Sequence, residues 1–333
     1  MRASPRVGRS SAFRSDRERS VRHRRRAGRG VTAESAQVRE GQTFDGASRL
    51  TRYVNLVKLP HTLFALPFAL VGVVLASYTR PVTWRVVAWV AVAFTAARFA
   101  AMGFNRIADR RLDAENPRTA RREIPSGAIR VGEAAAAVAV AAAVFVFAAW
   151  RLNPLCLWLS PLALGWVFFY SYTKRFTHFA HLALGLGTGI APVGGYLAVT
   201  GVWSRPWWAL VLLALAVMGW VGGFDIFYAL QDIGFDRQHG LHSLPVTLGE
   251  RGAIRVARLL HTMTVLCLAA AGLALGGGNW YLAGAVVVAV LLIYEHSLVR
   301  PGDLSRLDAA FFTTNGIVSV TFFAFVLLER VLR

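Results

Sequence analysis

The chain has 333 residues, of which 55% are hydrophobic and 17% charged, and its mean hydropathy is +0.46. This composition excludes an ordinary water-soluble domain and predicts a membrane protein. The formal net charge of +19 does not indicate nucleic-acid binding, because residues 1–30 alone hold eleven arginines against two acidic residues and the other basic residues flank apolar segments.

The first segment of the chain, residues 1–45, is rich in Arg, Ser and Gly and has no apolar periodicity. Such a segment buries too little apolar surface to offset the entropy of ordering, so we expect a disordered N-terminal extension. It is either an organelle transit peptide or an extension upstream of a true start near Val31, and we favour the extension. Residues 46–333 are then expected to form one transmembrane domain.

Apolar segments of about the 20 residues needed to cross a bilayer follow. They lie at 61–79, 84–104, 131–151, 153–171, 178–200, 207–228, 252–276, 279–299 and 307–329. The sequence therefore predicts an all-α, polytopic membrane protein with about nine transmembrane helices.

The connections between these segments alternate in their basic residues. Arginine and lysine gather in the N-terminal segment and in the connections 105–130, 172–177, 229–258 and 300–306. Because basic residues concentrate on the cytoplasmic side, we expect a cytoplasmic N-terminus and an outside C-terminus.

Acidic residues cluster in the two long cytoplasmic connections. Asn105, Asp109 and Asp113 are four residues apart, which places them on one helical face. Asp225, Asp232 and Asp236 follow steps of seven and four and also share a face. The recurrence of the Asp-x3-Asp spacing suggests two pseudo-repeated halves around a central cavity.

Several carboxylates at a membrane boundary repel one another and need cations. Hard oxygen ligands suit Mg²⁺, and two such sites facing each other would clamp a diphosphate, with nearby basic residues such as Arg237 binding the remaining phosphate oxygens. A simpler alternative is that these acidic and basic residues only keep the loops solvated and pair with each other. An ion-coupled membrane transporter is a further alternative, because intramembrane acids and internal repeats also describe carriers.

The stretch from Asn105 to Asp113 resembles the first NxxxDxxxD motif of the UbiA superfamily of intramembrane aromatic prenyltransferases, and Asp225 to Asp236 resembles the second. The Tyr170-x3-Lys174 element is similar to that family as well, as is the stretch Lys58-Leu-Pro-His61. The likeness spans about residues 50–330. It implies a fold of nine membrane helices around a central cavity, capped by the two long loops.

The resemblance also implies roles for individual residues. One Mg²⁺ is assigned to Asn105, Asp109 and Asp113, and a second to Asp232 and Asp236, with Asp225 in support. Lys174, together with Arg118 or Arg122, is expected to contact phosphate, and Tyr170 is expected to lie near the reacting carbon. His61 either binds the acceptor or is an ordinary interfacial histidine.

The implied reaction is transfer of a polyprenyl group from polyprenyl diphosphate to an aromatic acid. The stretch from Asn116 to Gly127 looks closest to the UbiA-like enzymes of the futalosine menaquinone route, so menaquinone biosynthesis is the expected pathway. The alternative within the enzyme class is a 4-hydroxybenzoate polyprenyltransferase of ubiquinone biosynthesis. The expected location is the bacterial inner membrane, with the active site facing the cytoplasm.

Overall fold

A computed structural model describes Met1 and residues 48–57, 59–307 and 309–333, while the side chains of residues 50, 59–64, 309 and 312 are outside the description. The expected N-terminal extension, residues 1–45, therefore lies outside the described residues apart from Met1. The described part is α-helical and contains no strand beyond one isolated bridge between Arg300 and Asp303.

Most helices follow one another with short connections, but residues 116–130 form a long connection between α5 and α6. In chain order they are α2 (Arg49–Leu56), α3 (Leu59–Ala76), α4 (Trp84–Ala108), α5 (Arg110–Glu115), α6 (Val131–Leu152), α7 (Pro154–Thr173), α8 (Ala180–Thr200), α9 (Trp208–Ala229), the 3-10 turn η1 (Leu230–Asp232), α10 (Ile233–Gln238), α11 (Leu244–Ala274), α12 (Asn279–Leu298), the π-helical turn η2 (Ala309–Thr314) and α13 (Asn315–Leu332).

Among the described residues, eight helices are long and apolar enough to cross a membrane. Helix α3 is also apolar, but the part of it whose side chains are described, Ala65–Ala76, is shorter than a span. The all-α, polytopic fold class is thus confirmed, whereas the count of nine spans stays a prediction.

Two spans differ from their predicted bounds by more than four residues. Helix α11 begins at Leu244, eight residues before the predicted start at 252, and bends at Gly249, whose φ of 68° lies in the left-handed region that favours glycine. The last predicted segment, 307–329, opens with the turn η2, and α13 starts only at Asn315. Hydropathy marks the apolar stretch but carries no signal for either irregularity.

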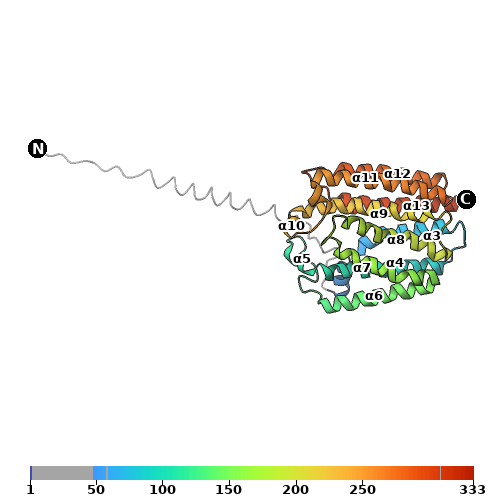
Figure 1. Cartoon of the computed structure of the whole chain (residues 1–333), viewed down its shortest axis with the longest axis horizontal. Coiled ribbons are helices and arrows are strands. Elements are labelled where there is room, and N and C mark those ends of the chain that lie inside the picture. The colour runs from blue at the N-terminus through green and yellow to red at the C-terminus, as the bar shows by residue number, and fades with distance from the viewer. Residues whose placement is uncertain (2–47, 58, 308) are drawn as a thin grey trace. The chain divides into compact units, whose positions relative to one another are not determined.

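Helix α9 is central, packing against α8 on one side and α11 on the other, while α3 packs on α8 and α13, and α4 packs on α6 (Figure 1). Small residues permit the close contacts. A Cβ on Gly185 would lie 2.4 Å from the Met218 carbonyl oxygen, and one on Gly189 would lie 2.6 Å from that of Ala214. These two glycines therefore let α8 approach α9 closely.

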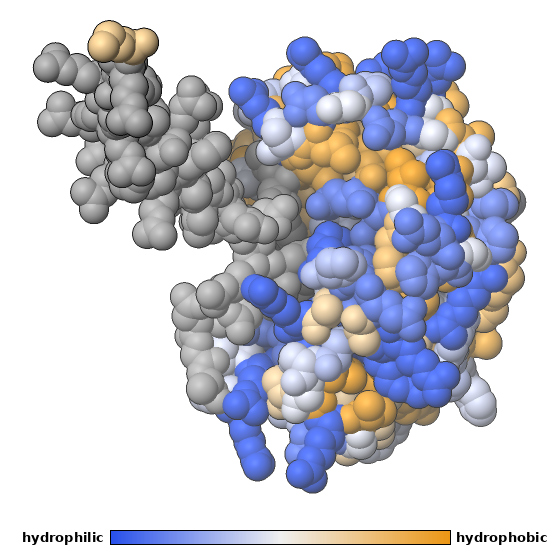
Figure 2. All heavy atoms as spheres, turned by 90° about the vertical axis from the view of Figure 1, so that its left-hand side faces the viewer, coloured by the Kyte–Doolittle hydropathy of each residue, from blue (hydrophilic) through white to orange (hydrophobic). Residues whose placement is uncertain are grey.

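Helices α5 and α10 lie at the same end of the bundle (Figure 1). Seen from that end, the surface is largely hydrophilic, with apolar residues showing between the polar ones (Figure 2). By contrast, large apolar side chains on the flanks, such as Trp158, Leu162 and Ile293, are exposed. An apolar flank with a polar end is the pattern of a bundle that sits in lipid and meets water at that end.

Candidate active site

Each acidic motif lies where a membrane helix breaks. Helix α4 ends at Ala108, Asp109 has the conformation φ −94°, ψ 5°, and the six-residue helix α5 then begins. Helix α9 ends at Ala229, the turn η1 ends at Asp232 with φ −100°, ψ 3°, and the six-residue helix α10 follows. Each motif was predicted to lie on one face of a continuous helix. Instead, each motif crosses a bend between a long helix and a short one, and the same bend occurs in both halves.

Both motifs line one cavity with a volume of about 270 Å³. The structure thus brings together most of the site residues expected from the sequence. Those that line the cavity are Asn105, Asp109, Asp113, Arg118, Arg122, Tyr170, Lys174, Asp225, Asp232 and Asp236.

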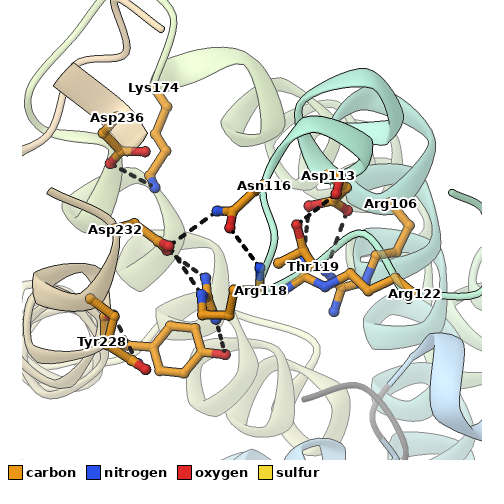
Figure 3. A network of polar contacts seen from close by, with 11 residues as sticks. Arg106, Asp113, Asn116, Arg118, Thr119, Arg122, Lys174, Tyr228, Asp232 and Asp236 are labelled. Atoms are coloured by element: carbon orange, nitrogen blue, oxygen red, sulfur yellow. Dashed lines mark hydrogen bonds and ion pairs between the residues drawn. The ribbon is translucent and has the colours of Figure 1, made fainter. Parts of the chain in front are cut away.

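On the side of the first motif, the buried carboxylate of Asp113 accepts a hydrogen bond from Arg122 Nη1 at 2.6 Å, and Arg106 lies 3.9 Å away (Figure 3). The connection after α5 holds Arg122 in place, because Thr119 Oγ1 donates to the Asp113 carbonyl at 2.9 Å. The second oxygen of Asp113, Oδ2, is buried and makes no hydrogen bond with any described residue.

The same connection reaches across the cavity to the second motif. Arg118 contacts Asp232 with two nitrogens, Nε donating to Oδ1 at 3.0 Å and Nη2 to Oδ2. Asn116 Nδ2 donates to the same Oδ1 at 3.2 Å, and Arg118 Nη1 donates to the hydroxyl of Tyr228 at 2.8 Å (Figure 3). A guanidinium that donates through two nitrogens in this way fits a carboxylate or a phosphate equally well.

The turn between α7 and α8 supplies one cation to each motif. Lys174 Nζ lies 3.4 Å from Asp236 Oδ2 in the second motif. Arg175 Nη2 lies 3.2 Å from Asp109 Oδ1 in the first, where Asn105 Nδ2 also donates to Asp109 Oδ2 at 2.9 Å. Every carboxylate of the two Asp-x3-Asp motifs is therefore paired with a basic side chain.

Burial and neighbouring charges shift the pKa values of Asp109 and Lys174. Burial and the neighbouring carboxylate of Asp113 raise the pKa of Asp109, and Arg175 and Lys174 only partly oppose that shift. Burial alone would lower the pKa of Lys174, but the carboxylates of Asp236, Asp225 and Asp232 outweigh it and raise the pKa. Lys174 is therefore a cation at neutral pH, and Asp109 takes up a proton more readily than an ordinary aspartate.

Asp225 lies deeper in α9 than the other acids and has a different partner. Its Oδ2 is 2.7 Å from Nδ1 of His181, a fully buried histidine on α8. Asp225 lines the same cavity as the two motifs. The contact with His181 holds this carboxylate within α9, seven residues before Asp232 in the sequence.

A second, almost wholly apolar chamber adjoins the polar cavity between α4, α6, α7 and α8. Arg98, Tyr170, Leu184 and Thr188 line both spaces and so mark the border between them. The Nε atom of Arg98 is buried and makes no hydrogen bond with any described residue. A cationic group with one unbonded donor atom, Nε, thus lies where polar and apolar space meet.

Two expected residues are not brought into the cavity by the described contacts. Arg237 is exposed and does not line it. His61 lies in the first turn of α3, but its side chain is outside the described residues.

Sequence reasoning also missed contributors. Arg175 carries no motif signal of its own, and Asn116 opens a stretch used above only for the choice of pathway, with no role assigned to it. Arg98 did have a signal, because it is an arginine inside an apolar span and lies seven residues before Asn105, on the same helical face.

The carboxylates of the two motifs suit Mg²⁺ by their donor chemistry and by the unbonded Oδ2 of Asp113. Asp109 and Asp113 on one side and Asp232 and Asp236 on the other are the candidate ligands. In the described part of the chain, no three His, Cys, Asp or Glu side chains already form a metal-binding group. Each of these carboxylates contacts a basic side chain.

The fold and the site together define a polytopic α-helical membrane protein with a charged cavity at one end of the bundle and an apolar chamber beside it. Residues 65–317 match the model of the UbiA prenyltransferase family. The chain belongs to this family and is a prenyltransferase.

Individual relatives agree with this assignment. The chain is 33% identical over 223 residues to a 4-hydroxybenzoate octaprenyltransferase of Aromatoleum aromaticum, covering 67% of this chain and 74% of the relative. The apo structure of a UbiA homolog from Aeropyrum pernix K1 has a TM-score of 0.74 and 34% identity over 81% of this chain and 98% of that one. A UbiA homolog from Archaeoglobus fulgidus bound to DMAPP and Mg²⁺ has a TM-score of 0.66 at 19% identity, over 85% and 100% of the two chains, and so supports the fold.

Proposed function

We propose that this chain transfers a polyprenyl group from polyprenyl diphosphate to 4-hydroxybenzoate in an Mg²⁺-dependent reaction. The observation that carries the proposal is that both acidic motifs and their basic partners line one cavity, which borders an apolar chamber across Arg98 and Tyr170. The diphosphate would bind in the charged cavity, and the isoprenoid chain would extend into the apolar chamber.

The charge balance of the cavity supports a bound magnesium diphosphate. Arg118, Arg122 and Lys174 now neutralise Asp232, Asp113 and Asp236. Two Mg²⁺ ions would take over the carboxylates and leave these three cations for the phosphate oxygens. One set of ion pairs is exchanged for another, so no uncompensated charge becomes buried.

The reaction breaks the bond between the allylic carbon and the diphosphate oxygen. Bound Mg²⁺ supplies Lewis-acid stabilisation of the charge that develops on the leaving diphosphate. Arg118, Arg122 and Lys174 stabilise the same charge through hydrogen bonds. Tyr170 lines both spaces, so it would lie near the allylic carbon, whose positive charge an aromatic ring can stabilise.

The acceptor ring would then attack the allylic carbon, form the new carbon–carbon bond and lose the displaced ring proton to the released diphosphate. Arg98 is the residue we assign to the carboxylate of the acceptor, because its Nε atom is buried without a partner among the described residues and points from a membrane helix that lines both spaces. A charge-assisted hydrogen bond to an aromatic acid would satisfy this donor.

The choice of acceptor follows the relatives. The sequence-based expectation favoured the menaquinone pathway, but the relatives that match this chain carry the name 4-hydroxybenzoate octaprenyltransferase. Family membership likewise favours the enzyme over the alternative of an ion-coupled transporter. We therefore prefer 4-hydroxybenzoate and ubiquinone biosynthesis over a naphthoic acceptor and menaquinone.

The orientation in the membrane remains that expected from the basic connections, with the cavity and the N-terminus on the cytoplasmic side of a bacterial inner membrane. The hydrophilic end at α5 and α10 supports a cavity that opens to water (Figure 2). We place the catalytic domain at residues 46–333 and expect deletion of residues 1–40 to leave turnover unchanged; a well-inserted but inactive truncation would contradict that boundary.

The decisive experiment offers the purified protein Mg²⁺, a panel of polyprenyl diphosphates and two acceptors, 4-hydroxybenzoate and 1,4-dihydroxy-6-naphthoate. Mass spectrometry should find prenylated 4-hydroxybenzoate as the main product, and chelation of Mg²⁺ should abolish it. Preference for the naphthoate would restore the menaquinone reading, and absence of any prenylated product together with solute transport into vesicles would overturn the enzyme proposal.

A further inference from the structure

A buried polar cluster lies beside the cavity, between α9, α11, α12 and α13. Its centre is Asn315, the first residue of α13, which is 2% exposed. The Oδ1 atom of Asn315 accepts a hydrogen bond from Trp220 Nε1 at 2.6 Å, and Nδ2 donates to Glu295 Oε1 at 3.1 Å. A polar side chain with this many partners inside a membrane bundle has a fixed orientation.

Glu295 is an unusual residue for its place. Its side chain is fully buried on α12, within a span, and such carboxyl groups are rare and mark functional positions. Only Oε1 bonds to Asn315, while Oε2 lies 3.9 Å from His261 Nδ1 and makes no hydrogen bond with any described residue. His261 in turn lies 3.1 Å from His296 Nε2. Glu295 itself does not line the cavity.

The amide of Asn315 also holds the backbone of the turn η2. Its Nδ2 atom lies 3.1 Å from the carbonyl oxygens of both Ala310 and Phe311. A π-helical turn leaves carbonyls that the regular α-helical ladder does not use, and such turns are frequent at functional sites. Asn315 therefore holds the backbone of the turn through these two carbonyls, and Glu295 Oε1 holds the amide of Asn315 in place.

The turn η2 presents Phe311 to the active-site cavity. The Phe311 ring stacks on Tyr228 with centroids 4.4 Å apart and meets Phe224 edge-on at 5.3 Å. Tyr228 accepts the hydrogen bond from Arg118, whose guanidinium also lies 4.9 Å from the Tyr228 ring centroid. The chain of contacts therefore runs from Glu295 through Asn315, Phe311 and Tyr228 to the arginine that binds Asp232.

We propose that Glu295 is a positioning residue for donor binding, acting through Asn315 and the turn η2 to hold Phe311 and Tyr228 against Arg118. This inference rests on the proposed function, because it takes Arg118 to bind the donor diphosphate. Glu295 acts by offering Oε1 to Asn315, so a neutral side chain with an oxygen in the same place keeps the function.

The test compares Glu295→Leu with Glu295→Gln in purified, membrane-inserted protein. Leucine removes the acceptor of Asn315, and we expect the KM for polyprenyl diphosphate to rise roughly tenfold; kcat should fall as well, because Arg118 also stabilises the charge on the leaving diphosphate. Glutamine keeps an acceptor oxygen and should restore a KM within about twofold of the unaltered protein. Glu295→Gln behaving like Glu295→Leu would overturn the positioning role.

Thr264→Val is the matched control. Thr264 is also buried, on α11, and its Oγ1 donates to the carbonyls of Ala216 and Leu260 at 2.9 and 3.0 Å, away from η2. This variant should keep the donor KM, since it removes a buried hydroxyl without touching the chain of contacts. An equal rise in KM in Thr264→Val would show general loosening of the bundle and would also overturn the inference.

Phe311→Leu tests the same series of contacts if Glu295→Leu does not accumulate in membranes. It leaves Glu295 and Asn315 in place, removes the ring behind Tyr228, and should raise the donor KM by the same factor. An unchanged KM in this variant would show that Phe311 does not link Asn315 to Tyr228 and would overturn the inference.

Titration of the protein with magnesium diphosphate separates the two proposals. If the unaltered protein forms no prenylated product, the proposed function fails, but the inference still predicts weaker diphosphate binding in Phe311→Leu. If the protein is active and both variants bind magnesium diphosphate as the unaltered protein does, the inference alone fails.

Discussion

Asp109 and Asp232 have nearly the same backbone conformation, φ −94°, ψ 5° and φ −100°, ψ 3°, although they lie in different halves of the chain. Each residue precedes a six-residue helix whose first turn carries the second acid of its motif, Asp113 in α5 and Asp236 in α10. The Asp-x3-Asp spacing is therefore a bend followed by one helical turn. This geometry places two carboxylates of each half along one wall of a shared cavity.

Asp232→Asn should lower kcat at least about a hundredfold, because the amide keeps the shape but loses the charge that binds a divalent cation. Asp109→Asn should do the same. Both proteins should still insert, since asparagine leaves no cavity in the core. The measurement is product formation at saturating donor and Mg²⁺.

Asp303→Asn provides the control for these two variants, because Asp303 is exposed in the connection before η2 and lies outside the cavity. It should retain normal turnover. Normal activity in Asp232→Asn would remove the metal assignment.

Arg98→Gln should raise the KM for 4-hydroxybenzoate about tenfold or more and leave the KM for the donor unchanged, because the lost interaction is a charge-assisted hydrogen bond to the acceptor carboxylate. The methyl ester of 4-hydroxybenzoate is the matching probe, since it lacks the charge. The variant and the unaltered protein should use the ester equally poorly. If Arg98→Gln instead raises only the donor KM, Arg98 belongs to the diphosphate site.

The apolar spans and both acidic motifs follow from the sequence, because hydropathy and a four-residue spacing are local properties. Val131–Leu152 and Pro154–Thr173 lie within two residues of the predicted bounds. The pairing of Arg118 with Asp232 joins residues 114 positions apart, and no local pattern encodes it. Arg98 is different, because an arginine within a span is a signal that the sequence does carry.

The turn η2 and the Glu295–Asn315 contact lie beyond local patterns as well. Glu295 is an acid within an apolar span, so the sequence flags it as unusual. Its partner comes from another helix, and only packing of α12 on α13 brings the two together.

The acid side of the pH–rate profile should depend on the Mg²⁺ concentration. Burial and Asp113 raise the pKa of Asp109, so this carboxyl binds a proton at a higher pH than an ordinary aspartate does. Because the metal needs the ionised form, its affinity falls as pH falls through that raised pKa.

Kinetics at two Mg²⁺ concentrations check this expectation. More Mg²⁺ should shift the acid limb of kcat/KM to lower pH, since metal and proton compete for the same carboxylate. An acid limb that does not move with Mg²⁺ would show that Asp109 is not a metal ligand.

Gly195→Ala should destabilise the bundle, whereas Gly194→Ala should not, although the two residues are neighbours on α8. A Cβ on Gly195 would lie 2.0 Å from the carbonyl oxygen of Ala69 on α3, while one on Gly194 would have no atom within 4 Å. Backbone cannot yield as a flexible side chain can, so we expect a loss of about 1–3 kcal/mol for Gly195→Ala. In Gly194→Ala the higher helix propensity of alanine should stabilise by up to about 1 kcal/mol.

Thermal unfolding of the two purified variants in the same detergent measures the difference. Tm should fall for Gly195→Ala and stay level or rise for Gly194→Ala, relative to the unaltered protein. Because the substitution is the same and the helix is the same, intrinsic propensity cancels, and the gap between the two Tm values reports the approach of α8 to α3. Equal Tm values would mean that the two helices pack less closely in the membrane protein than the Gly195–Ala69 contact requires.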